Sequence, residues 1–125
     1  MKIQESGEMY LETILILSEK SASVHAIDVC DHMGYSKPSV SRALGILKKA
    51  GYITVDEYNH IHLTEEGKSL AEKIYERHKY ITNCLIMLGI DEKTATDDAC
   101  RIEHVISDKS FYVIKDLMDK REKGQ

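Results

Sequence analysis

The chain has 125 residues, of which 30% are charged and 42% hydrophobic, and its formal net charge is −4 at pH 7. This length is enough for one compact domain or two small subdomains, and it argues against a large enzyme with a separate cofactor domain. The acidic balance gives no overall signature of nucleic-acid binding, so such a function must depend on a local basic patch. The start MKIQESGEMY turns polar at once and no apolar run approaches the length of a membrane span, which predicts a cytoplasmic protein that contacts no membrane.

The cysteines give a second composition signal. Cys30, Cys84 and Cys100 are odd in number and form no C-x-x-C pair. A disulfide framework or a structural zinc site is therefore not expected, and the thiols are predicted to be reduced.

Apolar periodicity predicts a first helix over about residues 5–20, with Tyr10, Ile14 and Leu17 on one face. Met9 and Glu12 are three residues apart and share a neighbouring strip of this helix. Taken alone, Met9 is best interpreted as a flexible side chain that fills a gap in the core.

A helix-turn-helix follows. The segment VHAIDVCDHM predicts a short helix that buries Ile27 and Cys30, with Val29 as a further candidate, and that ends at Gly34. In SKPSVSRALGILKKAG, Lys37 is expected to be the N-cap and Pro38 the first helical residue, because a residue before proline is pushed out of the helical region. The predicted buried stripe of this second helix comprises Val40, Leu44 and Leu47.

The second helix of this pair carries the local basic patch. Its basic residues are Lys37, Arg42, Lys48 and Lys49, and no acidic residue lies between Ser36 and Ala50. Hydroxyl side chains and an arginine at the start of a helix suit a recognition helix in the major groove. The candidate DNA contacts are Ser36, Lys37, Pro38, Ser39, Ser41 and Arg42. A basic helix face that is merely solvated is the alternative interpretation.

The next segment, YITVDEYNHIHLT, predicts a β-hairpin. Apolar residues alternate on either side of the polar turn DEYN, with Ile53 and Val55 before it and Ile61 and Leu63 after it. A helix-turn-helix followed directly by a hairpin is a winged helix, so the predicted fold class is mainly α with a hairpin wing. A winged helix can also serve as a protein contact alone.

The remaining chain predicts three more helices. Thr64 is the expected N-cap of a long helix whose apolar stripe is Leu70, Ile74, Ile81, Leu85 and Leu88, with His78 on that same stripe. A helix after Gly89 is expected to bury Ala95, Ala99, Ile102 and Ile106, and a final helix Phe111, Ile114 and Leu117. This is more helix than a lone winged helix needs, which suggests a homodimer that reads two half-sites.

The stretch DACRIEHVIS places three ligand-capable side chains on one helical face. Cys100, Glu103 and His104 span an arc of about 100°. They could bind a transition metal. They could equally be a small core cysteine beside two solvated side chains, and spacing alone does not decide between the two.

Four stretches together resemble the diphtheria-toxin-repressor family of metal-dependent transcriptional regulators: EMYLETIL, SKPSVSRALGILKKAGYI, HLTEEGKSLAEKIYERH and DDACRIEHVISD, within residues 5 to about 115. The resemblance implies a winged-helix DNA-binding domain over residues 1–63 and a helical metal-binding and dimerisation domain over residues 64–125. It also implies that a divalent cation is bound between the first helix, the long linking helix and the helix with the Glu-His pair. The ligands that it implies are Met9, Glu12, His78, Cys100, Glu103 and His104.

The implied ligand set combines features of two branches of the family. Met9 and Cys100 resemble the iron branch, whereas Glu12 and the absence of a third, SH3-like domain resemble the manganese branch. Thioether and thiol donors favour Fe²⁺ over Mn²⁺, which prefers oxygen ligands, so we expect Fe²⁺ first and Mn²⁺ second. Co²⁺, Ni²⁺ or Zn²⁺ could bind in vitro with higher affinity.

The expected function is therefore a homodimeric, metal-activated repressor that binds double-stranded palindromic operator DNA and controls metal-homeostasis genes. The main alternative is a metal-independent winged-helix regulator that responds to a small molecule or to oxidation of Cys100 or Cys84. Enzymatic activity is not expected, because nothing resembles H-E-x-x-H and a winged helix leaves little chain for a substrate cleft.

Overall fold

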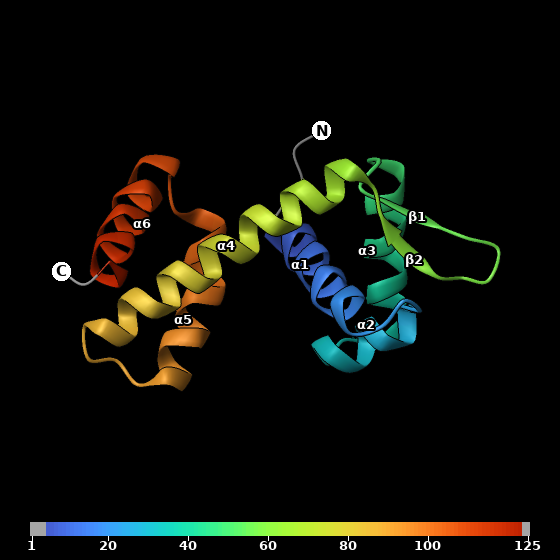
Figure 1. Ribbon diagram of the computed structural model, residues 1–125. Helices are drawn as coiled ribbons and strands as arrows, with labels where there is room; N and C mark the ends of the chain where they lie inside the picture. The colour runs from blue at the N-terminus through green and yellow to red at the C-terminus, as the bar shows by residue number, and fades with distance from the viewer. Residues whose placement is uncertain (1–4, 124–125) are drawn as a thin grey trace. The chain divides into compact units, whose positions relative to one another are not determined.

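A computed structural model describes residues 5–123 of the chain. Along the chain the elements are α1 (Glu5–Lys20), α2 (Ala26–Met33), α3 (Lys37–Lys49), β1 (Ile53–Val55), β2 (Ile61–Leu63), α4 (Glu65–Met87), α5 (Glu92–Val105) and α6 (Asp108–Glu122). They form two compact units, one that extends to Glu72 and one that begins at Lys73, so the division falls inside α4. The fold is a winged helix followed by a helical region, as the periodicity predicts (Figure 1).

The first unit is built around α1. This helix packs against α2, α3 and β2, and α3 also packs against α2 and β1. Figure 1 shows the hairpin of β1 and β2 projecting beyond these helices. The side chains with almost no exposed surface are Leu11, Ile14, Val29, Val40, Leu47 and Ile53. Three helices and one side of the hairpin thus share a single apolar core.

The turn between α2 and α3 corrects one prediction. Gly34 has a left-handed backbone with φ of 72°, as the C-cap prediction requires. The N-cap of α3, however, is Ser36, and the prediction of Lys37 was wrong. The Ser36 hydroxyl accepts a hydrogen bond from the backbone N–H of Ser39 at 3.3 Å, and a lysine side chain has no acceptor to do this.

The prediction for Ile27 was also wrong, since 52% of this residue is exposed. The buried face of α2 is centred between Val29 and Cys30. At about 100° per residue, Ile27 lies more than a quarter turn from that centre.

The hairpin is connected directly to α4. Ile53 pairs with Leu63 and Val55 with Ile61 in the antiparallel ladder. Thr64 then donates its hydroxyl to the carbonyl oxygen of Gly51 at 2.7 Å and accepts the backbone N–H of Gly67 at 3.1 Å. Thr64 therefore caps α4 and connects its first turn to the loop between α3 and β1, in agreement with the first residues of α4 belonging to the winged-helix unit.

The second unit comprises the later part of α4 with α5 and α6. Ile74, Ile81, Ala95, Ala99 and Phe111 are buried, in agreement with the predicted stripes. The other predicted residues are less buried. Leu88 is 68% exposed and Leu117 is 46% exposed, and the half-buried ones are Leu70, Leu85, Ile102, Ile106 and Ile114. Apolar periodicity identifies a face, but it does not tell whether the same chain covers the whole of that face. No helix within residues 5–123 is both long and apolar enough to span a membrane.

Candidate metal centre and nucleic-acid interface

Helix α5 positions three of the predicted ligands. The Asp91 side chain caps its N-terminus by accepting the backbone N–H of Thr94 at 3.0 Å, and this hydrogen bond lowers the pKa of Asp91. Ala95, Ala99 and Glu103 recur every four residues and form the buried face. Small side chains on this face let α5 approach its neighbours closely, and Glu103 comes at its end.

The second unit brings His78 of α4 to the side chains of α5. His78 Nδ1 lies 3.5 Å from Glu103 Oε2 and 3.9 Å from Cys100 Sγ. His104 Nε2 lies 3.6 Å from Glu103 Oε1, and its side chain is 2% exposed. One ligand atom from each of His78, Cys100 and Glu103 can be chosen so that all lie within 4.8 Å of one another. An imidazole, a thiol and a carboxylate thus converge within this unit.

The donor set fits a divalent transition metal. The Glu103 carboxylate is buried, and neither of its oxygens has a hydrogen-bond donor among residues 5–123. A buried carboxylate without donors is costly unless a cation compensates it. Thiolate and imidazole nitrogen are ligands for iron and the later first-row metals, and carboxylate suits these and manganese.

Arg77 of α4 contacts the C-terminal end of α5, and it is not among the predicted site residues. Its guanidinium is largely buried and donates to the carbonyl oxygens of Ile106 at 2.8 Å and Glu103 at 3.4 Å. It also pairs with Asp108 and lies over the Phe111 ring, 5.4 Å from its centroid. The available signal was its position on α4, three residues after Ile74 and four before Ile81, on the buried stripe.

The other two predicted ligands belong to the first unit. Met9 and Glu12 are both half-buried on α1, beside the buried residues Tyr10, Leu11 and Thr13. The three-residue spacing within α1 places Met9 and Glu12 on one strip of that helix, as predicted.

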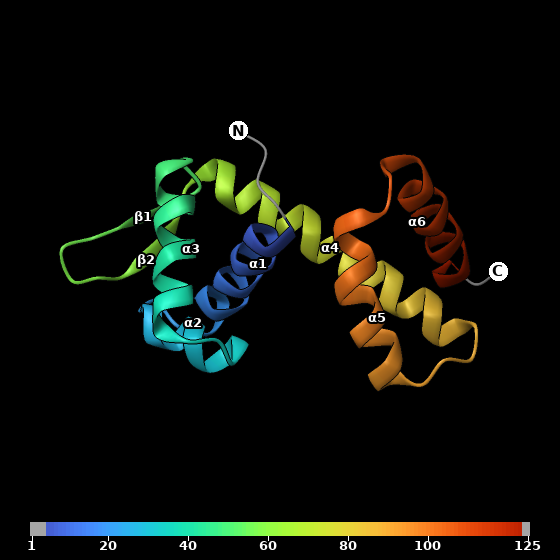
Figure 2. The same cartoon turned by 180° about the vertical axis from the view of Figure 1, so that it is seen from behind.

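The basic helix α3 presents a continuous exposed surface. Its buried residues are Val40, Leu44 and Leu47, whereas the candidate contacts Ser36, Lys37, Pro38, Ser41 and Arg42 are exposed and Ser39 is half-buried. Figure 2 shows α3 running beside the base of the hairpin. Ile46 is 57% exposed on the same side as Arg42, four residues earlier. Sequence reasoning missed Ile46, although an apolar residue off the core stripe is a visible signal.

Comparison with known proteins decides the family. Residues 2–61 match the model of the iron-dependent repressor N-terminal DNA-binding domain, and residues 64–124 match the model of the iron-dependent repressor metal-binding and dimerisation domain. The chain belongs to the iron-dependent repressor family. The predicted resemblance is confirmed, and so is the prediction that the chain is not an enzyme, because the family consists of DNA-binding transcriptional regulators.

Named relatives of this iron-dependent repressor family member cover most of its length. It is 34% identical over 120 residues to an uncharacterised HTH-type transcriptional regulator of Methanocaldococcus jannaschii, covering 94% of this chain and 96% of that protein. It is 29% identical over 119 residues to the HTH-type transcriptional regulator MntR of Lysinibacillus sphaericus, covering 95% of this chain and 86% of that protein.

A solved structure gives the same result for the fold of this family member. The manganese regulator SloR superposes with a TM-score of 0.82 at 25% identity. The match covers 95% of this chain and 55% of the SloR chain, so the chain spans about half of that protein. The DNA-binding model thus matches residues that lie wholly in the first unit, and the metal-binding and dimerisation model matches the second unit together with the start of α4.

Proposed function

We propose that this protein is a metal-activated, homodimeric repressor in which Met9, Glu12, His78, Cys100, Glu103 and His104 bind one divalent cation. The observation that carries the proposal is the buried Glu103 carboxylate, which has imidazoles near both oxygens and no hydrogen-bond donor in residues 5–123. A bound dication would supply the positive charge that compensates this carboxylate. The resemblance to the family adds Met9 and Glu12 to the four ligands of the second unit.

Fe²⁺ is the cation we propose, with Mn²⁺ as the second candidate. The Cys100 sulfur lies 3.9 Å from His78 Nδ1, and Met9 would add a thioether. These softer donors favour Fe²⁺ over Mn²⁺. Manganese is supported by the name of the SloR structure and by its 25% identity to this chain.

The regulatory step follows from where the ligands lie in the chain. Glu12 and Met9 belong to the unit that carries α3, whereas the other four ligands belong to the unit proposed to dimerise. Ligands from both units that share one ion would restrain one unit relative to the other. The restrained state would be selected if it binds the cation more tightly than other arrangements do. Only that state would present two α3 helices at the half-site spacing of a palindromic operator.

Exposed apolar side chains support dimerisation through the second unit. On α6, Tyr112 is 59% exposed, Val113 66% and Leu117 46%, and at the end of α4 Leu88 is 68% exposed. Large apolar side chains left exposed in this way are typical of residues at an interface. We propose that a second copy of the chain covers it, which would account for the exposure of Leu88 and Leu117.

On DNA, Arg42 is proposed to donate to a guanine edge, and the hydroxyls of Ser39 and Ser41 to contact phosphate or base edges. Ile46 would contact a thymine methyl group from the same side of α3. The regulated genes are proposed to be those of metal uptake or homeostasis.

The deciding experiment is an anaerobic titration of a palindromic operator from the gene's own promoter with the full-length protein. Binding is measured with Fe²⁺, Mn²⁺ or Zn²⁺ and with a chelator. We expect tight binding with Fe²⁺, loss of binding with chelator, and recovery on adding metal back. DNA affinity that is identical with metal and with chelator would contradict the proposal and favour a metal-independent regulator.

A further inference from the structure

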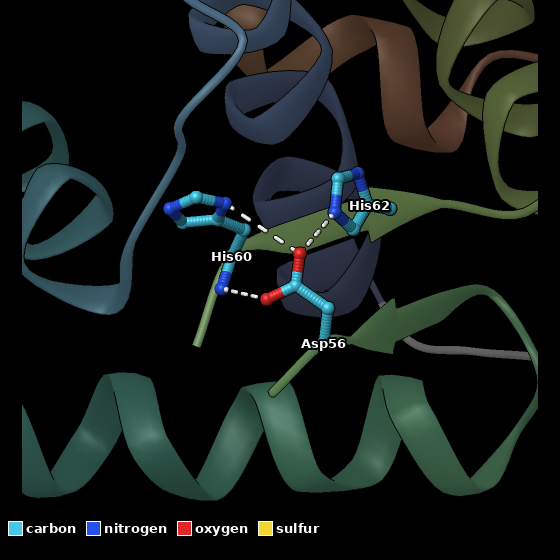
Figure 3. Close-up of side chains that lie close together, drawn as sticks. All are labelled: Asp56, His60 and His62. Atoms are coloured by element: carbon cyan, nitrogen blue, oxygen red, sulfur yellow. Dashed lines mark hydrogen bonds and ion pairs between the residues drawn. The ribbon is translucent and has the colours of Figure 1, made fainter. Parts of the chain in front are cut away.

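A second group of ligand-capable side chains lies on the wing, separate from the residues discussed above. It consists of Asp56, His60 and His62, and one ligand atom from each can be chosen so that all lie within 4.8 Å of one another. All three residues belong to the first unit. Figure 3 shows both imidazoles directed at the Asp56 carboxylate.

The hairpin creates this group through the strand alternation of β2. Successive side chains of a strand point to opposite faces, so His60 and His62 lie on one face, and Ile61 is buried on the other. Asp56 directly follows β1 and faces them across the turn. Both imidazoles therefore remain accessible, with side-chain exposures of 27% for His60 and 48% for His62.

The two oxygens of Asp56 have different roles. Oδ1 accepts the backbone N–H groups of Tyr58 at 2.9 Å and His60 at 3.0 Å, and these bonds fix the turn. Oδ2 is directed away from them and lies 2.9 Å from His62 Nε2 and 3.5 Å from His60 Nδ1. The hydrogen bond from His62, together with the one from the His60 backbone, lowers the pKa of Asp56 to about 2. The carboxylate is therefore anionic at neutral pH, and the turn itself holds it in place.

These separations match a transition-metal site. Zinc binds imidazole nitrogen and carboxylate oxygen at about 2.0–2.2 Å in a tetrahedral arrangement, which puts neighbouring ligand atoms about 3.4 Å apart. The distances from Asp56 Oδ2 to the two imidazole nitrogens lie on either side of this value. Small side-chain rotations would bring all three atoms to one ion, and the exposure of the site leaves a fourth position for water.

We propose that Asp56, His60 and His62 form a second metal site, on the wing, that binds Zn²⁺ or another imidazole-preferring cation such as Ni²⁺ or Co²⁺. Its ligands are nitrogen and oxygen, whereas the centre in the second unit includes the Cys100 thiol. The two sites therefore differ in their donor sets, and only the proposed centre in the second unit would offer a thiolate. A cation bound there connects the residue after β1 to β2 and closes the turn between them.

The neighbourhood of the site supports this assignment. The backbone N–H of Ile61 donates to the carbonyl oxygen of Val24 at 2.8 Å, which places the segment before α2 alongside β2. His25 consequently lies edge-on to His60, with ring centroids 4.6 Å apart. Three of the chain's six histidines thus gather at this corner of the first unit.

The test is zinc binding to the full-length protein, measured by equilibrium dialysis for wild type, His62→Ala, Asp56→Asn and His32→Ala. Asp56→Asn keeps an oxygen that can accept the turn N–H groups but removes the anionic ligand. His32→Ala is the matched control, because His32 is an exposed histidine of the same unit outside the group. We expect wild type and His32→Ala to bind one more zinc per chain than the other two variants. If the variants still bind some zinc at the wing site, we expect their affinity to be reduced by more than about tenfold. Replacing a residue that only supports a metal ligand already costs roughly 10–100-fold.

Co²⁺ absorption separates this site from the centre with Cys100. A thiolate ligand gives a sulfur-to-cobalt charge-transfer band, and a site with only nitrogen and oxygen ligands gives none. We expect His62→Ala to lose one cobalt and part of the d–d absorption while the charge-transfer band is unchanged. Zinc binding by His62→Ala and Asp56→Asn equal to that of wild type would overturn the proposal. So would a loss confined to the charge-transfer band.

Discussion

Arg77 donates its Nη1 group to the carbonyl oxygen of Ile106 across 2.8 Å, and so connects α4 to the C-terminal end of α5. The same nitrogen lies 3.4 Å from the carbonyl oxygen of Glu103. One buried cation therefore satisfies backbone acceptors at the end of the helix that carries Glu103 and His104. Arg77 is therefore a positioning residue for the proposed metal centre, because it contacts α5 through backbone carbonyl groups.

Arg77→Met should lower the free energy of unfolding of the second unit by about 2 kcal/mol. The substitution keeps most of the side-chain volume but leaves buried carbonyl groups without a donor, and each such group costs about 1–3 kcal/mol. Urea denaturation monitored by circular dichroism measures the change. Arg101→Met is the matched control, because Arg101 is an exposed arginine on α5. Equal stability of the two variants would show that Arg77 does not support the end of α5.

Glu103→Gln should have opposite effects on stability with and without metal. In chelator, the variant is expected to be more stable than wild type by about 1 kcal/mol, because a buried charge without hydrogen-bond donors is removed. With Fe²⁺ or Mn²⁺, wild type should gain stability by ligand binding and the variant should gain little. Thermal unfolding under both conditions tests this.

The control for that experiment is Glu92→Gln, at an exposed position in the first turn of α5. It should respond to metal as wild type does. If Glu103→Gln is much less stable than wild type in chelator, Glu103 stabilises the fold through ion pairs with His78 and His104 and is not a metal ligand.

Gly67→Ala should destabilise the winged-helix unit by about 1–3 kcal/mol through overpacking. A Cβ atom at Gly67 would lie 1.9 Å from the backbone carbonyl oxygen of Tyr52, which cannot move without disturbing the connection of the wing to α4. Gly45→Ala is the matched control, because a Cβ atom at Gly45 would have no other atom within 4 Å. Since Gly45 lies inside α3, its replacement should stabilise the protein by about 0.5–1 kcal/mol. If both variants shift stability in the same direction, the close approach at Gly67 is not limiting.

Tyr80 should make the protein sensitive to alkaline pH. Its hydroxyl donates to Asp119 Oδ1 at 2.6 Å, and this hydrogen bond, with a smaller contribution from burial, raises the pKa of Tyr80 to about 12. A tyrosine normally ionises near pH 10, so between about pH 10 and 12 the unfolded state releases a proton that the folded state retains. The stability from this bond is therefore complete below about pH 10 and is lost as the pH rises to about 12.

Two variants test the Tyr80 prediction. Tyr80→Phe should flatten the fall in stability between pH 10 and 12, and Asp119→Asn should move the ionisation of Tyr80 to lower pH. Both are measured by denaturation across this range, with tyrosinate absorbance as the direct readout. A wild-type titration in which all seven tyrosines ionise together near pH 10 would contradict the prediction.

Arg42→Ala should weaken operator binding without changing metal affinity. Arg42 is exposed on α3, and loss of a bidentate contact to guanine costs about 1–3 kcal/mol, together with relaxed specificity at that base. Ile46→Ala should cost less and should act at a thymine. Binding is measured by fluorescence anisotropy on operators substituted one base pair at a time. A uniform loss across all sequences would reassign Arg42 to phosphate contact.

Much of the fold followed from local patterns. Gly34 and Thr64 end and begin helices as predicted, because a left-handed C-cap and a hydroxyl N-cap are properties of a few neighbouring residues. The N-cap of α3 is Ser36 and not the predicted Lys37, because the Ser36 hydroxyl accepts a backbone N–H and Pro38 is tolerated at the second helical position as well as the first.

Sequence reasoning missed Ile46, which is exposed on α3, and two residues whose roles come from contacts outside their own helix or strand. Arg77 acquires its role from carbonyl groups after the next loop, and Asp56 from two histidines across a turn. The wing group had a signal in D-x-x-x-H-x-H, but the pattern becomes a site only when the hairpin turns Asp56 toward the strand.

By itself, the sequence determined the winged helix, the basic face of α3 and the shared face of Cys100, Glu103 and His104, because helix and strand periods place nearby side chains by geometry alone. The tertiary structure decided that His78 meets Cys100 and Glu103, that Glu103 is buried without a donor, and that Leu88 and Leu117 are left exposed. These features depend on how α4, α5 and α6 pack together, and packing sets both the distance between ligands and the solvation of a charge.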